Sequence, residues 1–160
     1  MEESYIKRIR SLVGDEFLIL NATAVVIVNH NNDILLQKRS DNGYWGLPGG
    51  LLELNDSITE GAIREVKEET NLDIAIKRFI GVFVNPFMRW KEKDTAKVYS
   101  FAFLGEVIGG ELRVNDSEST EMQYFSYENL PNIHSIDNIQ VIQAYYNNQY
   151  NLVEGEKYDG

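Results

Sequence analysis

The chain has 160 residues, of which 43% are hydrophobic and 25% are charged, and this length and composition predict one folded domain over residues 1–160. Fifteen lysines and arginines against 25 acidic residues give a net charge of −10, which argues against binding to long DNA or RNA. A polyphosphate is also negatively charged, so its binding to this acidic protein requires cations that neutralise the charge between them. The absence of cysteine excludes disulfides, thiolate zinc sites and a cysteine nucleophile.

The N-terminal segment and the apolar runs bear on the location of the protein. Residues 1–17 lack the apolar stretch of a signal peptide, and no apolar run approaches the roughly 20 residues that cross a bilayer. We therefore expect a soluble, cytoplasmic protein that does not contact a membrane.

The remaining pattern predicts a mixture of helices and strands. Apolar residues at helical spacing predict a short helix within residues 1–16 that ends at Gly14. The β-rich segments 21–29 and 34–39, with turn residues between them, predict a hairpin. Further along, the pattern predicts a loop over 40–50, a helix over 57–70, strands over 74–84, 97–107 and 121–127, a polar connection over 85–95, a helix over 136–146 and a flexible tail over 151–160. The sum is an α/β (α+β) sandwich with a mixed sheet.

The helix predicted at 57–70 is unusually acidic on one side. Ser57 and Glu60 have the spacing of a capping box, which starts the helix near Ile58. At about 100° per residue, Glu65, Glu68 and Glu69 share one arc that borders the predicted core face. Their mutual repulsion favours a compensating hard cation such as Mg²⁺ or Mn²⁺, because the cluster lacks His and Cys. The alternative for these three residues taken alone is a solvated acidic surface.

The residues before and within this helix have a distinctive spacing: Gly50, five residues, Asp56, seven residues, then Arg64-Glu65-Val66-Lys67-Glu68-Glu69-Thr70-Asn71-Leu72. This stretch resembles the box of the Nudix (MutT-like) hydrolase family, G-x5-E-x7-R-E-U-x-E-E-x-G-U with U aliphatic. Seven of the nine specified positions agree over 23 residues, and Leu47-Pro48-Gly49 precede the box as in the family. The resemblance implies a Nudix-like α/β/α sandwich, with the box at residues 50–72.

Two positions depart from the box. Asn71 replaces a glycine, and asparagine tolerates the left-handed conformation expected just past a helix. Asp56 replaces a glutamate that in the family pairs with the box arginine, and its shorter side chain makes the pairing with Arg64 an open question.

The resemblance also implies an activity. Family members hydrolyse a nucleoside diphosphate linked to another moiety, such as a nucleoside triphosphate, a nucleotide sugar, ADP-ribose or a dinucleoside polyphosphate, by attack of water on phosphorus. It implies that Mg²⁺ or Mn²⁺ is bound by Glu65, Glu68, Glu69 and the carbonyl of Gly50, with Arg64 beside them among the catalytic residues. The family often recruits a further carboxylate from outside the box, for which Glu118 and Glu121 are candidates.

The candidate substrate-binding residues lie outside the box. Arg39 matches a position that is often basic in the family and is a candidate for holding a phosphate. Trp45 and Trp90 fall in predicted loops, where an aromatic face stacks on a base unless it packs locally. The expected partner is a small nucleotide, and the N-terminal helix with the tyrosine-rich C-terminal segment is a candidate homodimer contact.

Two other functions fit the same sequence. A non-catalytic nucleotide-binding or regulatory module on this fold binds nucleotide without turnover, although such a module gains little from clustered carboxylates. A purely structural acidic helix shows no saturable stabilisation by Mg²⁺ or Mn²⁺. The sequence leaves open the substrate, the general base, the number of metal ions and the oligomeric state.

Overall fold

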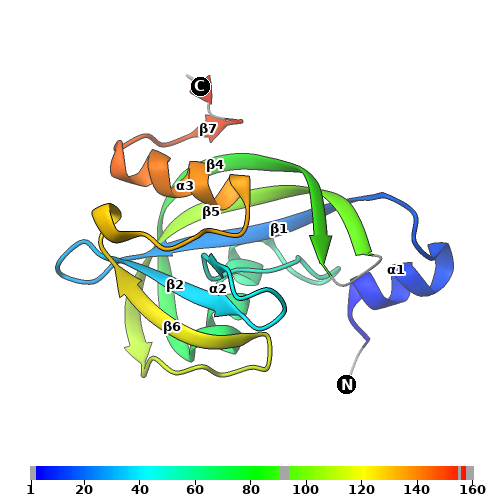
Figure 1. Cartoon of the computed structure of the whole chain (residues 1–160), viewed down its shortest axis with the longest axis horizontal. Helices are drawn as coiled ribbons and strands as arrows, with labels where there is room; N and C mark the ends of the chain where they lie inside the picture. The colour runs from blue at the N-terminus through cyan, green and yellow to red at the C-terminus, as the bar shows by residue number, and fades with distance from the viewer. Residues whose placement is uncertain (1–2, 91–93, 155, 158–160) are drawn as a thin grey trace.

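The computed structural model describes residues 3–90, 94–154 and 156–157, and within them three α-helices and two sheets are formed (Figure 1). In chain order the elements are α1 (Tyr5–Val13), β1 (Leu18–Ile27), β2 (Ile34–Arg39), β3 (Trp45–Gly46), α2 (Ile58–Thr70), β4 (Leu72–Trp90), β5 (Asp94–Gly110), β6 (Ser119–Phe125), a 3₁₀ turn (Tyr127–Asn129), α3 (Ile136–Tyr146), β7 (Leu152–Val153) and β8 (Glu156–Lys157). No helix in these described ranges has the length and apolar character needed to cross a membrane.

The strands form one mixed sheet and one small antiparallel sheet. The first has the order β1-β5-β4-β7-β8, with β1 parallel to β5 and β4 antiparallel to β5. The second has the order β3-β2-β6. In Figure 1, α3 lies in front of the strands and α2 behind them. The predicted sandwich of helices around a mixed sheet is therefore confirmed.

From Ala24 to Ile27, strand β1 is buried on both of its faces, which accounts for the unbroken apolar run there. Ala24 and Val26 belong to the core cluster on the α3 side, whereas Val25 and Ile27 belong to the cluster on the α2 side. Successive side chains of a strand point to opposite faces, so a strand between two helical layers must be apolar at every position. One face of this strand therefore packs against α2.

The predicted hairpin of residues 21–29 and 34–39 is wrong. A turn does form there, but β1 and β2 share only the single bridge Val28–Ile34 and continue into different sheets. The edge of β1 that β2 would occupy is taken by the glycine loop, because Thr23 N–H donates to the Gly50 carbonyl at 2.9 Å and Val25 N–H to the Pro48 carbonyl at 2.8 Å. This pairing fixes the glycine loop beside α2.

Two further expectations are corrected. The predicted connection over 85–95 is largely strand, because β4 runs on to Trp90 and pairs with β5 from Asp94. Pro86 is accommodated where the register shifts between Asn85 and Met88, as expected of a proline within a sheet. The predicted tail over 151–160 is also ordered in part: Leu152 is buried and pairs with Gly81, while residues 155 and 158–160 lie outside the described part.

Helix α2 begins and ends as the sequence predicts. The Ser57 hydroxyl accepts a hydrogen bond from Glu60 N–H, and the Glu60 side chain accepts one from Ser57 N–H, which completes the capping box. Asn71 ends the helix with φ 65° and ψ 10°, and its side-chain amide donates to the Glu111 carbonyl. Ala62 and Val66 are fully buried. The departure from glycine at position 71 is thus accommodated.

The conformation of Asn71 generates the first prediction. Asn71→Ala should lower the free energy of unfolding by about 1–2 kcal/mol, because alanine pays the left-handed penalty that asparagine tolerates. Asn71→Gly should change it by less than about 0.5 kcal/mol, because glycine adopts this conformation freely. Urea denaturation followed by circular dichroism measures both. Equal losses in the two variants would instead assign the effect to the side-chain bond with Glu111.

Candidate active site

Two of the three box glutamates on α2 are withdrawn from solvent. Glu69 is 3% exposed and the side chain of Glu65 is 15% exposed, whereas the side chain of Glu68 is 55% exposed. Burial raises the pKa of Glu65 to about 7, with the charge of Glu68 acting in the same direction. Burial also raises the pKa of Glu69 well above its usual range, and the neighbouring Glu65 adds to this. Both shifts favour the neutral, protonated carboxyl over the charged form unless a cation offsets the cost of desolvation.

The buried Glu69 is held by groups from three separate segments. Gln37 Nε2 on β2 donates to Glu69 Oε2 at 2.6 Å, and Gly49 N–H donates to the same oxygen at 3.2 Å. Asn115 N–H donates to the Glu69 backbone carbonyl at 3.1 Å. None of these donors is cationic, so they orient the Glu69 side chain without adding a positive charge beside it.

The glycine loop approaches α2 too closely for any side chain. A Cβ atom on Gly50 would lie 2.6 Å from Glu65 Cδ. At Gly49, φ is 150° and a Cβ atom would lie 2.0 Å from the Thr23 carbonyl oxygen. The structure thus places Gly50 against Glu65, and the Gly50 carbonyl already accepts a hydrogen bond from Thr23 N–H.

Arg64 compensates the carboxylates on the outer side of the helix. Its Nη2 lies 2.6 Å from Asp56 Oδ2 and its Nε lies 3.2 Å from Asp56 Oδ1, so the shorter acid at position 56 still makes a two-pronged pair. The hydrogen bond from Arg64 lowers the pKa of Asp56. Arg64 Nη1 also lies 3.1 Å from both Glu65 and Glu68. The open question about the pairing of Asp56 is answered by this contact.

The oxygen atoms at this site are of the kind that bind hard cations, although the side chains do not surround a single ion position. Within residues 3–90, 94–154 and 156–157, no three His, Cys, Asp or Glu side chains are placed to hold one ion. Glu65 and Glu69 lie together beside Gly50, and Glu68 is turned to Arg64. Carboxylate and carbonyl oxygens in a site that concentrates negative charge fit Mg²⁺ or Mn²⁺.

The three residues expected to bind substrate have different surroundings in the structure. Arg39 makes a two-pronged pair with Asp41, at 3.0 and 2.7 Å, and this hydrogen bonding lowers the pKa of Asp41. Trp45 is 9% exposed and packs edge to face on Phe125, with 4.9 Å between ring centroids, so its ring serves mainly the core. Trp90 ends β4, and its side chain lies outside the described residues.

The two expected loop carboxylates do not join Glu69. Glu121 pairs with Lys38 at 3.5 Å, and this cross-strand pair lies on the opposite face of β2 from Gln37 because adjacent side chains alternate. Glu118 N–H donates to Asp116 Oδ1, and no side-chain contact joins Glu118 to the described part of α2.

The residues missed by sequence reasoning come from β2 and the loop before β6. Asn115 is bonded to the C-terminal turn of α2, and the charge of the adjacent Asp116 contributes to raising the pKa of Glu69. For Gln37, the available signal was the change from the apolar run Ile34–Leu36 to a polar side chain. For Asn115 and Asp116 the polar loop held no such signal.

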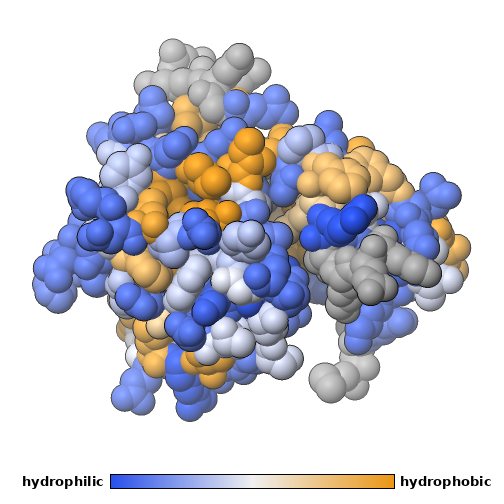
Figure 2. Space-filling model, viewed as in Figure 1, coloured by the Kyte–Doolittle hydropathy of each residue, from blue (hydrophilic) through white to orange (hydrophobic). Residues whose placement is uncertain are grey.

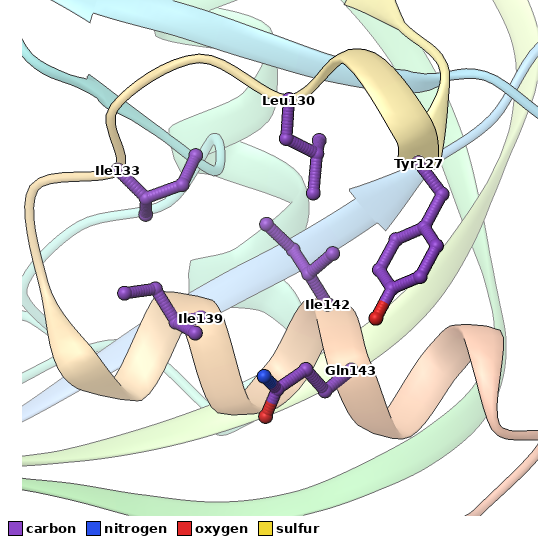
Figure 3. Close-up of a pocket in the computed structure, with 6 residues that line it drawn as sticks. All are labelled: Tyr127, Leu130, Ile133, Ile139, Ile142 and Gln143. Carbon is purple, nitrogen blue, oxygen red and sulfur yellow. The ribbon is translucent and has the colours of Figure 1, made fainter.

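Two hollows lie away from the glutamates. One, of about 210 Å³, is formed between α3 and the segment before it, where Figure 3 shows the side chains facing one another, and Figure 2 shows apolar side chains gathered on this face. Its lining residues are Tyr127, Leu130, Ile133, Ile139, Ile142 and Gln143. The other, of about 410 Å³, is lined by Lys38, residues 42–45 and residues 130–132, so Trp45 contributes to its wall. Neither is lined by the α2 carboxylates.

Comparison with known proteins gives concordant matches. Residues 19–145 match the family described as NUDIX domain. An ADP-ribose pyrophosphatase of Methanocaldococcus jannaschii is 37% identical over 123 residues, which cover 74% of this chain and 69% of the relative. A MutT-like protein of Streptomyces ambofaciens is 33% identical over 105 residues, covering 66% of this chain and 62% of the relative. The crystal structure of an ADP-ribose pyrophosphatase from Streptococcus suis superposes with a TM-score of 0.66 at 27% identity, covering 88% of this chain and 98% of that one.

The Asp56–Arg64 pair generates the second prediction. Asp56→Ala should lower the free energy of unfolding by about 1–3 kcal/mol, because Arg64 loses a charged hydrogen-bond partner that is mostly buried. Asp56→Glu should retain most of the stability. The control is Glu106→Ala, which breaks the exposed pair between Glu106 and Lys77 and should cost less than about 0.5 kcal/mol. Urea denaturation decides, and equal losses for the buried and exposed pairs would contradict the structural role of Asp56.

Proposed function

Since this chain belongs to the Nudix family of hydrolases, we propose that it is a metal-dependent pyrophosphohydrolase that cleaves a nucleoside diphosphate linked to another moiety. The main support for the proposal is that Glu65 and Glu69 are both withdrawn from solvent and that the backbone of Gly50 lies directly against Glu65. Two adjacent carboxylates that are withdrawn from solvent destabilise the fold when both are charged, and a bound divalent cation offsets that cost. Their retention supports a catalytic site on α2.

The cation proposed for this site is Mg²⁺ or Mn²⁺, since Nudix hydrolases generally use divalent metal ions. The residues that would hold it are Glu65, Glu69 and the carbonyl of Gly50, with Glu68 joining once it leaves Arg64. When bound, such an ion neutralises charge on the phosphates and makes water a better nucleophile. The proposal needs no covalent nucleophile, in keeping with phosphoryl transfer that relies on positioning and charge.

The residues of the chain have distinct tasks in this proposal. Arg64 holds Glu65 and Glu68 on the outer side, while Gln37 and Gly49 hold Glu69 on the inner side. Arg39 exchanges the carboxylate of Asp41 for a substrate phosphate, because guanidinium pairs with both groups in the same two-pronged geometry. Asp116 is the loop carboxylate that we propose in place of Glu121 for a supporting role beside Glu69.

The substrate class follows from the family, and ADP-ribose is the first compound to test. A relative at 37% identity and a solved structure at 27% identity are both named as ADP-ribose pyrophosphatases, which supports this choice. Nucleoside triphosphates, nucleotide sugars and dinucleoside polyphosphates complete the panel, because all of them contain the same anhydride bond.

The test of the proposed function is hydrolysis of this panel by the pure protein with Mg²⁺ or Mn²⁺. We expect release of a nucleoside monophosphate from at least one compound, measured by anion-exchange chromatography. Glu65→Gln and Glu69→Gln should each reduce kcat/KM by at least about 100-fold, because a direct contribution to metal-assisted charge stabilisation is worth several kcal/mol. Glu106→Gln, on the exposed surface, should leave it unchanged.

The competing function is a non-catalytic nucleotide-binding module, which the pairing of Glu68 with Arg64 in this structure favours. It predicts no turnover at high protein concentration and nucleotide binding that is equal in the parent and in the Glu68→Gln and Glu69→Gln variants. Isothermal titration with the same panel separates the two functions. Binding without turnover would refute the hydrolase.

The loop carboxylates provide a fourth prediction. Asp116→Asn should lower kcat about 10-fold or more, because its charge acts on Glu69, whereas Glu121→Gln should change kcat less than about twofold. Steady-state kinetics on the best substrate measures both variants. A large effect of Glu121→Gln with none of Asp116→Asn would contradict this assignment and restore Glu121, one of the two carboxylates that the sequence suggested.

A further inference from the structure

Gln37 lies at the point where β2 meets the buried carboxylates. The three residues before it, Ile34 to Leu36, are fully buried and apolar. At position 37 the strand changes to a carboxamide, whose Nε2 donates to Glu69 Oε2 at 2.6 Å across two separate layers of the fold. Gly49 N–H donates to the same oxygen, so both contacts leave Glu69 Oε1 for another partner. The two donors fix the direction in which the carboxylate points.

A role in packing alone does not explain this side chain. The other polar atom of Gln37, Oε1, is buried and has no hydrogen-bond partner among the described residues. A buried acceptor without a partner is unfavourable, and an apolar side chain of the same length would avoid it. The amide is therefore kept at this position for the bond that its nitrogen makes.

The Gln37 side chain is uncharged, and this matters for the proposed binding of a cation by Glu69. Cationic side chains follow directly on the same strand, but Lys38 pairs with Glu121 and Arg39 pairs with Asp41. A lysine or arginine at position 37 would neutralise Glu69 and compete with a divalent ion for it. A carboxamide orients the Glu69 side chain and brings no positive charge that would compete with a divalent ion.

We propose that Gln37 is a positioning residue that holds Glu69 through one oxygen without adding a positive charge, so that Glu65 and Glu69 present a preorganised site for a divalent cation. This rests on the proposed function, in which Glu69 binds that ion. Groups that orient metal ligands from behind typically control metal affinity by about 10- to 100-fold. Gln37 then sets the affinity for the ion without touching the substrate.

The test is Mn²⁺ binding by the full-length protein without substrate, measured by electron paramagnetic resonance of the free ion. Gln37→Met keeps the length of the side chain and removes the donor, and it should weaken Mn²⁺ binding about 10- to 100-fold. The matched control is Gln123→Met, because Gln123 is exposed and pairs with Leu36 on the opposite face of the same sheet. It should bind Mn²⁺ as the parent does.

A second variant separates orientation from charge. Gln37→Lys keeps a donor but adds a cation, and it should raise the melting temperature in metal-free buffer while abolishing the further increase that Mn²⁺ gives the parent. Undiminished Mn²⁺ binding by either position-37 variant would overturn the proposal. A Gln37→Met variant that loses melting temperature but keeps the parent's Mn²⁺ affinity would make the residue structural.

The same titration distinguishes this proposal from the one on which it rests. If the parent binds Mn²⁺ and the Gln37 variants bind it equally well, only the positioning role fails. If the parent shows no saturable binding, the cation site itself fails, and with it both proposals. Recovery of hydrolysis by Gln37→Met at high Mn²⁺, with an unchanged KM for the nucleotide, would support the positioning role.

Discussion

The placement of two carboxylates in the interior governs the arrangement around α2. Glu69 is almost fully buried and Glu65 nearly so, one helical turn apart, and in a low dielectric such neighbours repel and resist ionisation. Donors contact the pair on two sides, and among Arg64, Gln37 and Gly49 only Arg64 is cationic. Arg64 contacts Glu65 from the solvent side, and the neutral groups of Gln37 and Gly49 contact Glu69 from the interior. The result is a carboxylate pair that is oriented but not fully compensated, which is the electrostatic condition for attracting a divalent ion.

The surrounding backbone follows from this constraint. Positions 49 and 50 must be glycine because Thr23 and Glu65 occupy the space that side chains would need. The same loop forms hydrogen bonds with the edge of β1. The loop between β5 and β6 is held by Asn115 and Arg113, whose N–H groups satisfy carbonyls at the end of α2. Those carbonyls would otherwise lack partners, as at any helix end. One set of hydrogen bonds therefore ends the helix and brings a further acidic residue, Asp116, toward Glu69.

The features that the sequence predicted well are local ones. The capping box at Ser57, the left-handed Asn71 and the buried Ala62 and Val66 depend on residues within one or two turns of each other. The errors concern partners far apart in the chain. Nothing local shows that residues 48–52 take the edge of β1, or that β4 continues through Pro86 by pairing with β5. Gln37 escaped notice for the same reason, since its partner is 32 residues away and its strand is too short and too buried to show a clear alternation.

The placement of the loop carboxylates shows how a single residue of register decides which acid reaches the site. Along β2 and β6 the pairing is regular from Ile34 to Lys38, and it then shifts, so that Lys38 faces Glu121 and Arg39 faces Ser119. Thr120 is the extra residue, and an insertion of this kind bends a strand and redirects the side chains before it. Glu121, after the shift, stays in the regular pairing and faces away from Glu69. The segment before the shift is released from the sheet and bonds to the end of α2 through Asn115. Distance along the sequence could not reveal this difference, because it arises from the alternation of the strand and from where that alternation is interrupted.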